Sequence, residues 1–137
     1  MTVDDRVSKA GESIDEAELE ALHEVELGFE WLQRAQGYLL EFHHATGHAM
    51  DHLAVAESTL RDAGHDDLAD RLREDLLPAG VVDGDRWSYD VLECFQGTML
   101  EETRALERQV RAELADGERH LPERLQEREW RRRADEW

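Results

Sequence analysis

The sequence predicts an all-α protein: a long-helix antiparallel bundle of about four helices that dimerisation completes. Three observations point to this class. Apolar residues recur three and four positions apart over most of the chain, which is the spacing of amphipathic helices. Only Pro78 and Pro122 interrupt it, and no segment shows the alternation typical of a strand. Glycine and aspartate gather at 62–67, 78–85 and 116–117, which separates four helical stretches.

The first predicted helix is unusually long, from Ile14 to about Ala63. Ser13 is its predicted N-cap, Glu16 completes a capping box three residues on, and Gly64 follows its last turn. The stripe that we expect to be buried consists of Leu22, Val25, Phe29, Leu32, Leu39, Met50, Leu53 and Leu60.

Three shorter helices follow in the prediction. The second covers 66–77 and stops at Pro78, because proline disfavours helical geometry in the residue before it. The third begins between Asp85 and Ser88 and ends before Gly117. The last has Pro122 at a first helical position and continues through residue 133 with a poor apolar stripe.

The lengths of these helices favour a homodimer. An unbroken first helix spans about 75 Å, and the second and third together come to roughly 60 Å, so they pair as two antiparallel rods. Two paired helices leave much of each apolar stripe exposed to solvent, which favours a dimeric four-helix bundle. A helix break near Gly28 or Gly47, giving a compact monomer, is the alternative. Trp130 and Trp137 are the predicted dimer anchors.

This pattern divides the chain into three parts. Residues 1–12 carry no helical pattern and are expected to be disordered. Residues 13–120 form the predicted bundle domain, and residues 121–137 form a predicted C-terminal helical arm.

The charge of the chain is strongly negative. Acidic residues number 34 against 16 basic ones, giving a net charge of −18. Such a field repels phosphate backbones and anionic lipid surfaces, so neither nucleic acid nor a membrane is an expected partner. No stretch has the apolar length of a membrane span, residues 1–11 lack the apolar region of a signal peptide, and Cys94 is the sole cysteine. These features predict a cytoplasmic protein.

The bias within the charged residues is also informative, since Lys9 is the only lysine and the other basic residues are arginine. Carboxylates retain water in concentrated salt better than lysine does. In composition the chain resembles the small acidic proteins of halophilic archaea. That resemblance implies a potassium-rich cytoplasm and no particular activity; an acidic protein of ordinary salt is the alternative.

Histidines cluster between residues 41 and 52. On a helix, His44, His48 and His52 form a ladder on one face, with Glu41 and Asp51 beside it. These five residues are the predicted metal-ligand set, because imidazole and carboxylate together suit zinc, nickel, copper or iron. A solvated polar face and a pH-sensitive contact are the alternatives.

His43 falls within the apolar stripe instead, where we expect a core histidine hydrogen-bonded to a neighbouring element. Glu57 and Glu102 also lie in or beside apolar stripes. Partial cover, an arginine partner and a role as an inward metal ligand remain open for both.

Two Glu-x-x-His pairs, Glu20 with His23 and Glu41 with His44, have a spacing that resembles the ligand pairs of ferritin-like di-metal carboxylate bundles. In that family the two pairs lie on different helices, and each of two further helices adds a glutamate. Here both pairs lie on one predicted helix.

Motifs for common catalytic chemistry are absent from the sequence: it has no phosphate loop, no nucleophile elbow, no CxxC pair and no His-Glu-x-x-His run. The leading hypothesis is therefore a non-enzymatic helical scaffold or interaction protein. The alternatives are a metal-binding bundle built on the histidine cluster and, as a third class, a regulator that docks its short helices on DNA.

The acidic surface predicts that the fold loosens in dilute buffer, because carboxylates that salt no longer screens repel one another. The helical circular-dichroism signal should fall when molar potassium chloride is replaced by about 20 mM buffer. An unchanged signal would contradict this expectation.

Overall fold

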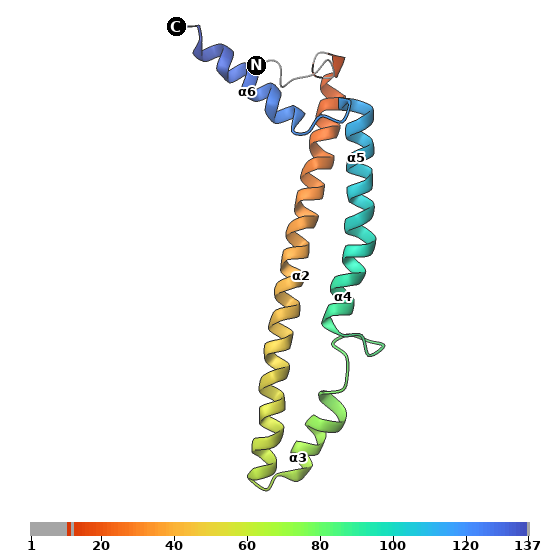
Figure 1. The fold of residues 1–137 in the computed structure, drawn as a ribbon, viewed down its shortest axis with the longest axis vertical. Helices are drawn as coiled ribbons and strands as arrows, with labels where there is room; N and C mark the ends of the chain where they lie inside the picture. Colours follow the sequence, from red (N-terminus) through yellow and green to blue (C-terminus); the bar gives the residue numbers. More distant parts are fainter. Residues whose placement is uncertain (1–10, 12, 137) are drawn as a thin grey trace. The chain divides into compact units, whose positions relative to one another are not determined.

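The computed structural model describes residues 11 and 13–136 of the chain, so the predicted disorder of residues 1–12 lies almost wholly outside it. Within this part the protein is all-α, as predicted (Figure 1). Its elements in order are α2 (Glu16–Asp62), α3 (Asp66–Arg71), the π-helical turn η2 (Leu72–Leu76), α4 (Ser88–Phe95), the π-helical turn η3 (Gln96–Leu100), α5 (Glu101–Ala115) and α6 (Leu121–Ala134). No helix in the described residues is long and apolar enough to cross a membrane.

Helix α2 is continuous, so it is broken at neither Gly28 nor Gly47. It begins two residues later than predicted. The capping box is formed by Asp15 and Glu18: the Asp15 carboxylate accepts the Glu18 N–H at 2.7 Å, and the Glu18 carboxylate accepts the Asp15 N–H at 3.3 Å. An aspartate at this position satisfies a free N–H and also places negative charge at the positive end of the helix dipole.

The segment predicted as a third helix is one run of consecutive helical turns, α4, η3 and α5. It opens on a one-way side-chain cap, in which the Asp90 carboxylate accepts the Trp87 N–H at 2.9 Å. The wider turn η3 contains Gly97 and Thr98, whose hydroxyl donates to the Cys94 carbonyl at 2.6 Å. Asp116, with φ of 49°, ends α5 in the left-handed conformation.

The chain forms two compact units, Met1–Leu32 with Leu100–Trp137, and Gln33–Met99. We call them the terminal unit and the middle unit. The predicted boundaries at 12 and 120 follow a different division and stay predictions.

The terminal unit is held by a small core in which Leu22, Ala115 and Leu121 are fully buried. Half-buried side chains complete it: Ile14, Leu19, Val110, Leu114 and Leu125. Farther along, the Arg104 guanidinium lies 5.6 Å from the centre of the Phe29 ring, a cation–π contact. Because Leu22 meets the end of α5 and Phe29 meets its start, the two helices run antiparallel here.

The middle unit is also an antiparallel hairpin of helical segments. Near the turn, Arg61 of α2 donates to Asp70 of α3 at 3.0 Å. At the other end, His43 of α2 shares a hydrogen bond with Ser88 of α4. Between α3 and α4, Val81 and Arg86 close a tight loop through the Val81 N–H and the Arg86 carbonyl at 2.7 Å.

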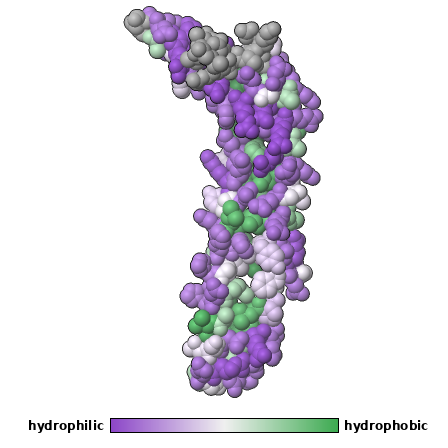
Figure 2. Space-filling view, viewed as in Figure 1, coloured by the Kyte–Doolittle hydropathy of each residue, from purple (hydrophilic) through white to green (hydrophobic). Residues whose placement is uncertain are grey.

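Polar side chains predominate on the face of the molecule that Figure 2 shows, and the apolar ones lie in separate patches between them. The burial of the side chains agrees with this view. Among the described residues, Leu22 and Leu121 are the only large apolar side chains that are fully buried.

The tight loop that Val81 and Arg86 close requires glycine at position 80. A Cβ atom at this position would collide with the backbone of Asp85 and Arg86, whereas a Cβ at Gly37, inside α2, would meet nothing. We expect Gly80→Ala to destabilise the protein by about 1–3 kcal/mol and Gly37→Ala, the matched control, to stabilise it by about 0.5–1 kcal/mol. Urea unfolding in molar potassium chloride measures both. Equal effects of the two substitutions would contradict the close approach.

Candidate functional site

The predicted metal-ligand set lies on the outside of the middle unit. Glu41, His44, His48, Asp51 and His52 are all exposed on α2. Their helical spacing keeps the histidines on one face, but among the described residues none of the five belongs to a group of three or more ligand atoms within 4.8 Å of one another. A metal site on this ladder stays a prediction.

His43 has the environment predicted for it. Its Nδ1 atom and the hydroxyl of Ser88 lie 2.7 Å apart, and Ser88 is buried. The histidine therefore satisfies the one polar side chain that the middle unit buries among its described residues.

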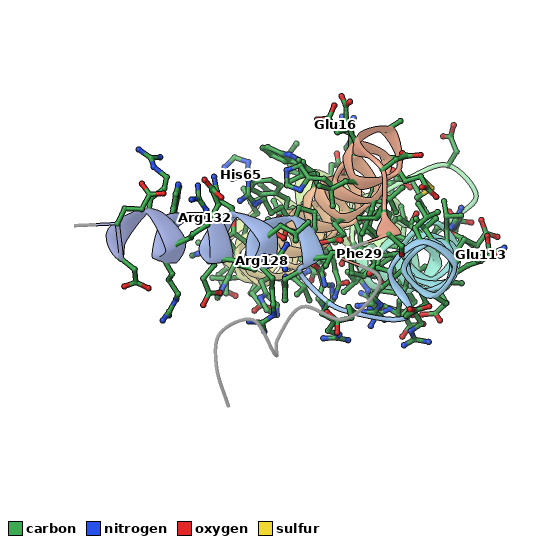
Figure 3. The ribbon with its side chains drawn as sticks, turned by 90° about the horizontal axis from the view of Figure 1, so that it is seen from above. Glu16, Phe29, His65, Glu113, Arg128 and Arg132 are labelled. Carbon is green, nitrogen blue, oxygen red and sulfur yellow. The ribbon has the colours of Figure 1, made fainter. Side chains whose placement is uncertain are left out.

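Three other predicted features can be placed. Glu57 lies 3.8 Å from Arg61, so an arginine is its partner in an ion pair. Glu102 is exposed. Cys94 is exposed as well. Near the end of α6, Arg132, which is labelled in Figure 3, donates hydrogen bonds to Glu129 and Glu136. This hydrogen bond to Arg132 lowers the pKa of Glu129.

A cluster of metal-ligating side chains that the sequence reasoning missed lies in the terminal unit. One ligand atom each from Glu26, His120 and Glu123 lie within 4.8 Å of one another. Glu26 belongs to α2, His120 precedes α6, and Glu123 is in the first turn of α6. A fourth side chain, His23 of α2, points its Nδ1 atom to within 3.7 Å of the Glu123 carboxylate. We call these residues the His/Glu cluster.

Two atoms of this cluster are buried without a hydrogen-bond partner, Nδ1 of His23 and one carboxylate oxygen of Glu26. The separation of 3.7 Å between His23 and Glu123 is too long for a hydrogen bond. Buried polar atoms in proteins are normally paired, so these two atoms mark the cluster as unusual.

The electrostatics of the cluster favour a bound proton or cation. Partial burial, followed by the neighbouring charges of Glu123 and Glu107, raises the pKa of Glu26 to about 7. His23 and Arg111 act in the opposite direction and do not offset these effects. Arg111 itself lies 3.6 Å from Glu107.

A sequence signal for the cluster existed. His23 and Glu26, and likewise His120 and Glu123, have the spacing His-x-x-Glu, which places both members on one helical face. The sequence prediction instead paired His23 with Glu20, three residues before it, as a Glu-x-x-His pair. Nothing in the spacing shows that residues 23 and 120 meet, because that depends on how α6 returns to α2.

A second candidate feature is an apolar face of α2 in the middle unit. Tyr38 and Phe42 are 69% and 39% exposed, and Ala45 and Ala49 continue their line along the helix. His52 and Ala56 extend it with the same alternation of four and three residues. We call this line the outer seam.

The comparisons with known proteins add no family. No protein-family model matches the chain, and no match was found among curated proteins or solved structures. We therefore infer the function from the geometry of the His/Glu cluster and the outer seam.

The raised pKa of Glu26 predicts how stability depends on pH. The folded-state pKa lies above the unfolded one, so the folded protein holds the extra proton; that contribution is complete below about pH 4.5 and is lost as pH rises through about 7. With a chelator present, Glu26→Gln should make the protein more stable above pH 7, by on the order of 1 kcal/mol, because partial exposure screens the effect. Denaturation at several pH values measures this.

The control is Glu24→Gln, a substitution of an exposed glutamate on the same helix, which should change stability little at any pH. A Glu26→Gln protein that is less stable than the parent at pH 8 would show that the carboxylate is not destabilising.

Proposed function

We propose that this protein is a self-associating helical scaffold, a homodimer in which the middle units of two copies form a four-helix bundle through the outer seam. The observation that carries the proposal is the exposure of Tyr38 and Phe42 on a helix face with heptad spacing.

Helix α2 has two neighbouring apolar seams in the middle unit, and its own chain covers one. The covered seam is half-buried and consists of Leu39, His43, Thr46, Met50, Leu53, Glu57 and Leu60. It faces the returning segments, as the bond between His43 and Ser88 shows. The outer seam is displaced from it by one residue, or about 100° around the helix. Helices that contact two neighbours in a four-helix bundle have this double pattern.

The outer seam is complementary to itself. If two α2 helices cross antiparallel about Gly47, Ala45 of each copy faces Ala49 of the other. The same register places Phe42 opposite His52 and Tyr38 opposite Ala56, so large side chains meet small or medium ones. A two-fold interface requires such self-complementarity, which is why a second copy is the proposed occupant.

The small side chains at the centre allow close approach of the two helices, and the aromatic ones at the ends supply most of the apolar area. Glu41 borders the seam on α2, and in this register it lies near the position of His52 in the other copy. A protonated histidine there would offset part of the repulsion between two chains that each carry a net charge of −18.

The acidic surface suits such a dimer to concentrated salt. Screening by molar potassium chloride removes most repulsion between the copies, while the carboxylates keep the dimer hydrated. A halophilic cytoplasm is the environment that we propose on this basis. Trp130, 60% exposed on α6, remains a candidate second contact; Trp137 lies outside the described residues.

The test is a charge placed in the seam. Light scattering in molar potassium chloride should give twice the 15.9 kDa of one chain for the parent protein. Ala45→Glu should lower the measured mass to that of the monomer, because a carboxylate buried against Ala49 of the other copy has no partner.

Ala54→Glu is the matched control. Ala54 is exposed on the same helix and points away from the outer seam, so this variant should remain dimeric. A monomeric parent protein, or a dimer that tolerates Ala45→Glu as well as Ala54→Glu, would refute the proposed interface.

A further inference from the structure

We propose that His23, Glu26, His120 and Glu123 bind one divalent transition-metal ion, for which zinc is the suitable probe. The site lies within the terminal unit and does not depend on the proposed dimer.

Three side chains of the His/Glu cluster place their ligand atoms near the separation that one ion requires, and His23 lies beside them. Metal–ligand distances of about 2.0–2.2 Å mean that two donors of one ion lie no more than about 4.4 Å apart. The ligand atoms of Glu26, His120 and Glu123 lie within 4.8 Å of one another, which is near this limit. His23 Nδ1 lies 3.7 Å from Glu123, well within this limit. Movements of these side chains by less than a few ångströms would be needed to bring all four donors to bonding distance of one ion.

An ion would also satisfy the two orphan atoms. The buried Nδ1 of His23 and the buried oxygen of Glu26 have no hydrogen-bond partner in the protein. A metal ion accepts a lone pair from each, which replaces an unpaired polar atom by a bond.

The charge around the cluster favours a cation. Glu26, Glu123 and Glu107 come together at this place, and Arg111 is the basic side chain among them. Arg111 lies beside Glu107, at 3.6 Å, and its charge does not offset the repulsion between the carboxylates of Glu26 and Glu123. A divalent ion neutralises those two carboxylates.

The ligands are held in place by the core. Leu22 and Leu121 are fully buried in one core. Leu22 immediately precedes His23, and Leu121 immediately follows His120. His120 adopts a left-handed backbone conformation, with φ of 60°, as the chain enters α6. Anchored neighbours reduce the conformational freedom that metal binding would otherwise remove.

The set of donors selects the class of ion. Two imidazoles with two carboxylates suit zinc and its first-row neighbours, whereas magnesium and calcium prefer oxygen alone. The His44/His48 ladder offers imidazoles too, but on one exposed helix face. The two places are distinguished by substitution.

Calorimetric titration of the full chain with zinc chloride, after removal of metal by a chelator, tests the proposal. The parent protein should bind one zinc ion per chain. His120→Asn should lower the affinity at least tenfold, and this substitution suits the site because asparagine tolerates the left-handed backbone. Glu26→Gln should have an effect of similar size, and the double variant should show no binding. Circular dichroism confirms that each variant is folded.

The control is His44→Gln with His48→Gln, which removes the ladder and should leave zinc affinity unchanged. Magnesium chloride should give no comparable heat. The proposal is wrong if the parent binds no zinc, if affinity follows the ladder residues, or if the folded His120→Asn and Glu26→Gln proteins bind zinc as the parent does.

Discussion

The apolar spacing along α2 is the constraint on which the rest of the structure depends. This helix contributes to both compact units, and in each the other segments pack on its apolar residues. In the terminal unit it contributes Leu22 to a fully buried core. In the middle unit it offers two seams, and the returning segments cover one of them. The outer seam stays exposed because, among the described residues, the middle unit gives α2 only one antiparallel partner.

The two units handle burial differently. The terminal unit has a three-sided arrangement, because α6 returns its first turn to α2 and α5 and buries Leu121 there. That return brings two histidines and two glutamates from separate parts of the sequence to one place. The middle unit has no third segment of this kind among its described residues, so its apolar residues are half-buried at best, apart from Ala69 and Leu92. A second copy would supply what α6 supplies in the terminal unit.

Repulsion between carboxylates bears on both the proposed metal site and the proposed dimer. A chain with 34 acidic and 16 basic residues loses stability by self-repulsion wherever carboxylates gather. At the His/Glu cluster the carboxylates of Glu123 and the neighbouring Glu107 act on Glu26, and the free energy of keeping Glu26 ionised is reflected in its raised pKa. A cation at this place and concentrated salt around the surface act on the same repulsion, one locally and the other over the whole chain.

The sequence by itself determined the class of fold, the helical segments between the glycine and proline clusters, and the environment of His43, because amphipathic spacing and local turn chemistry are written in neighbouring residues. It misplaced the cap of α2 by two residues, since Ser13 and Asp15 are both good caps and only the hydrogen bonds at Glu18 choose between them. The His/Glu cluster was decided by tertiary structure alone. Residues 23 and 26 are a long way along the chain from residues 120 and 123, and they meet because the burial of Leu22 and Leu121 in one core brings the first turn of α6 against α2.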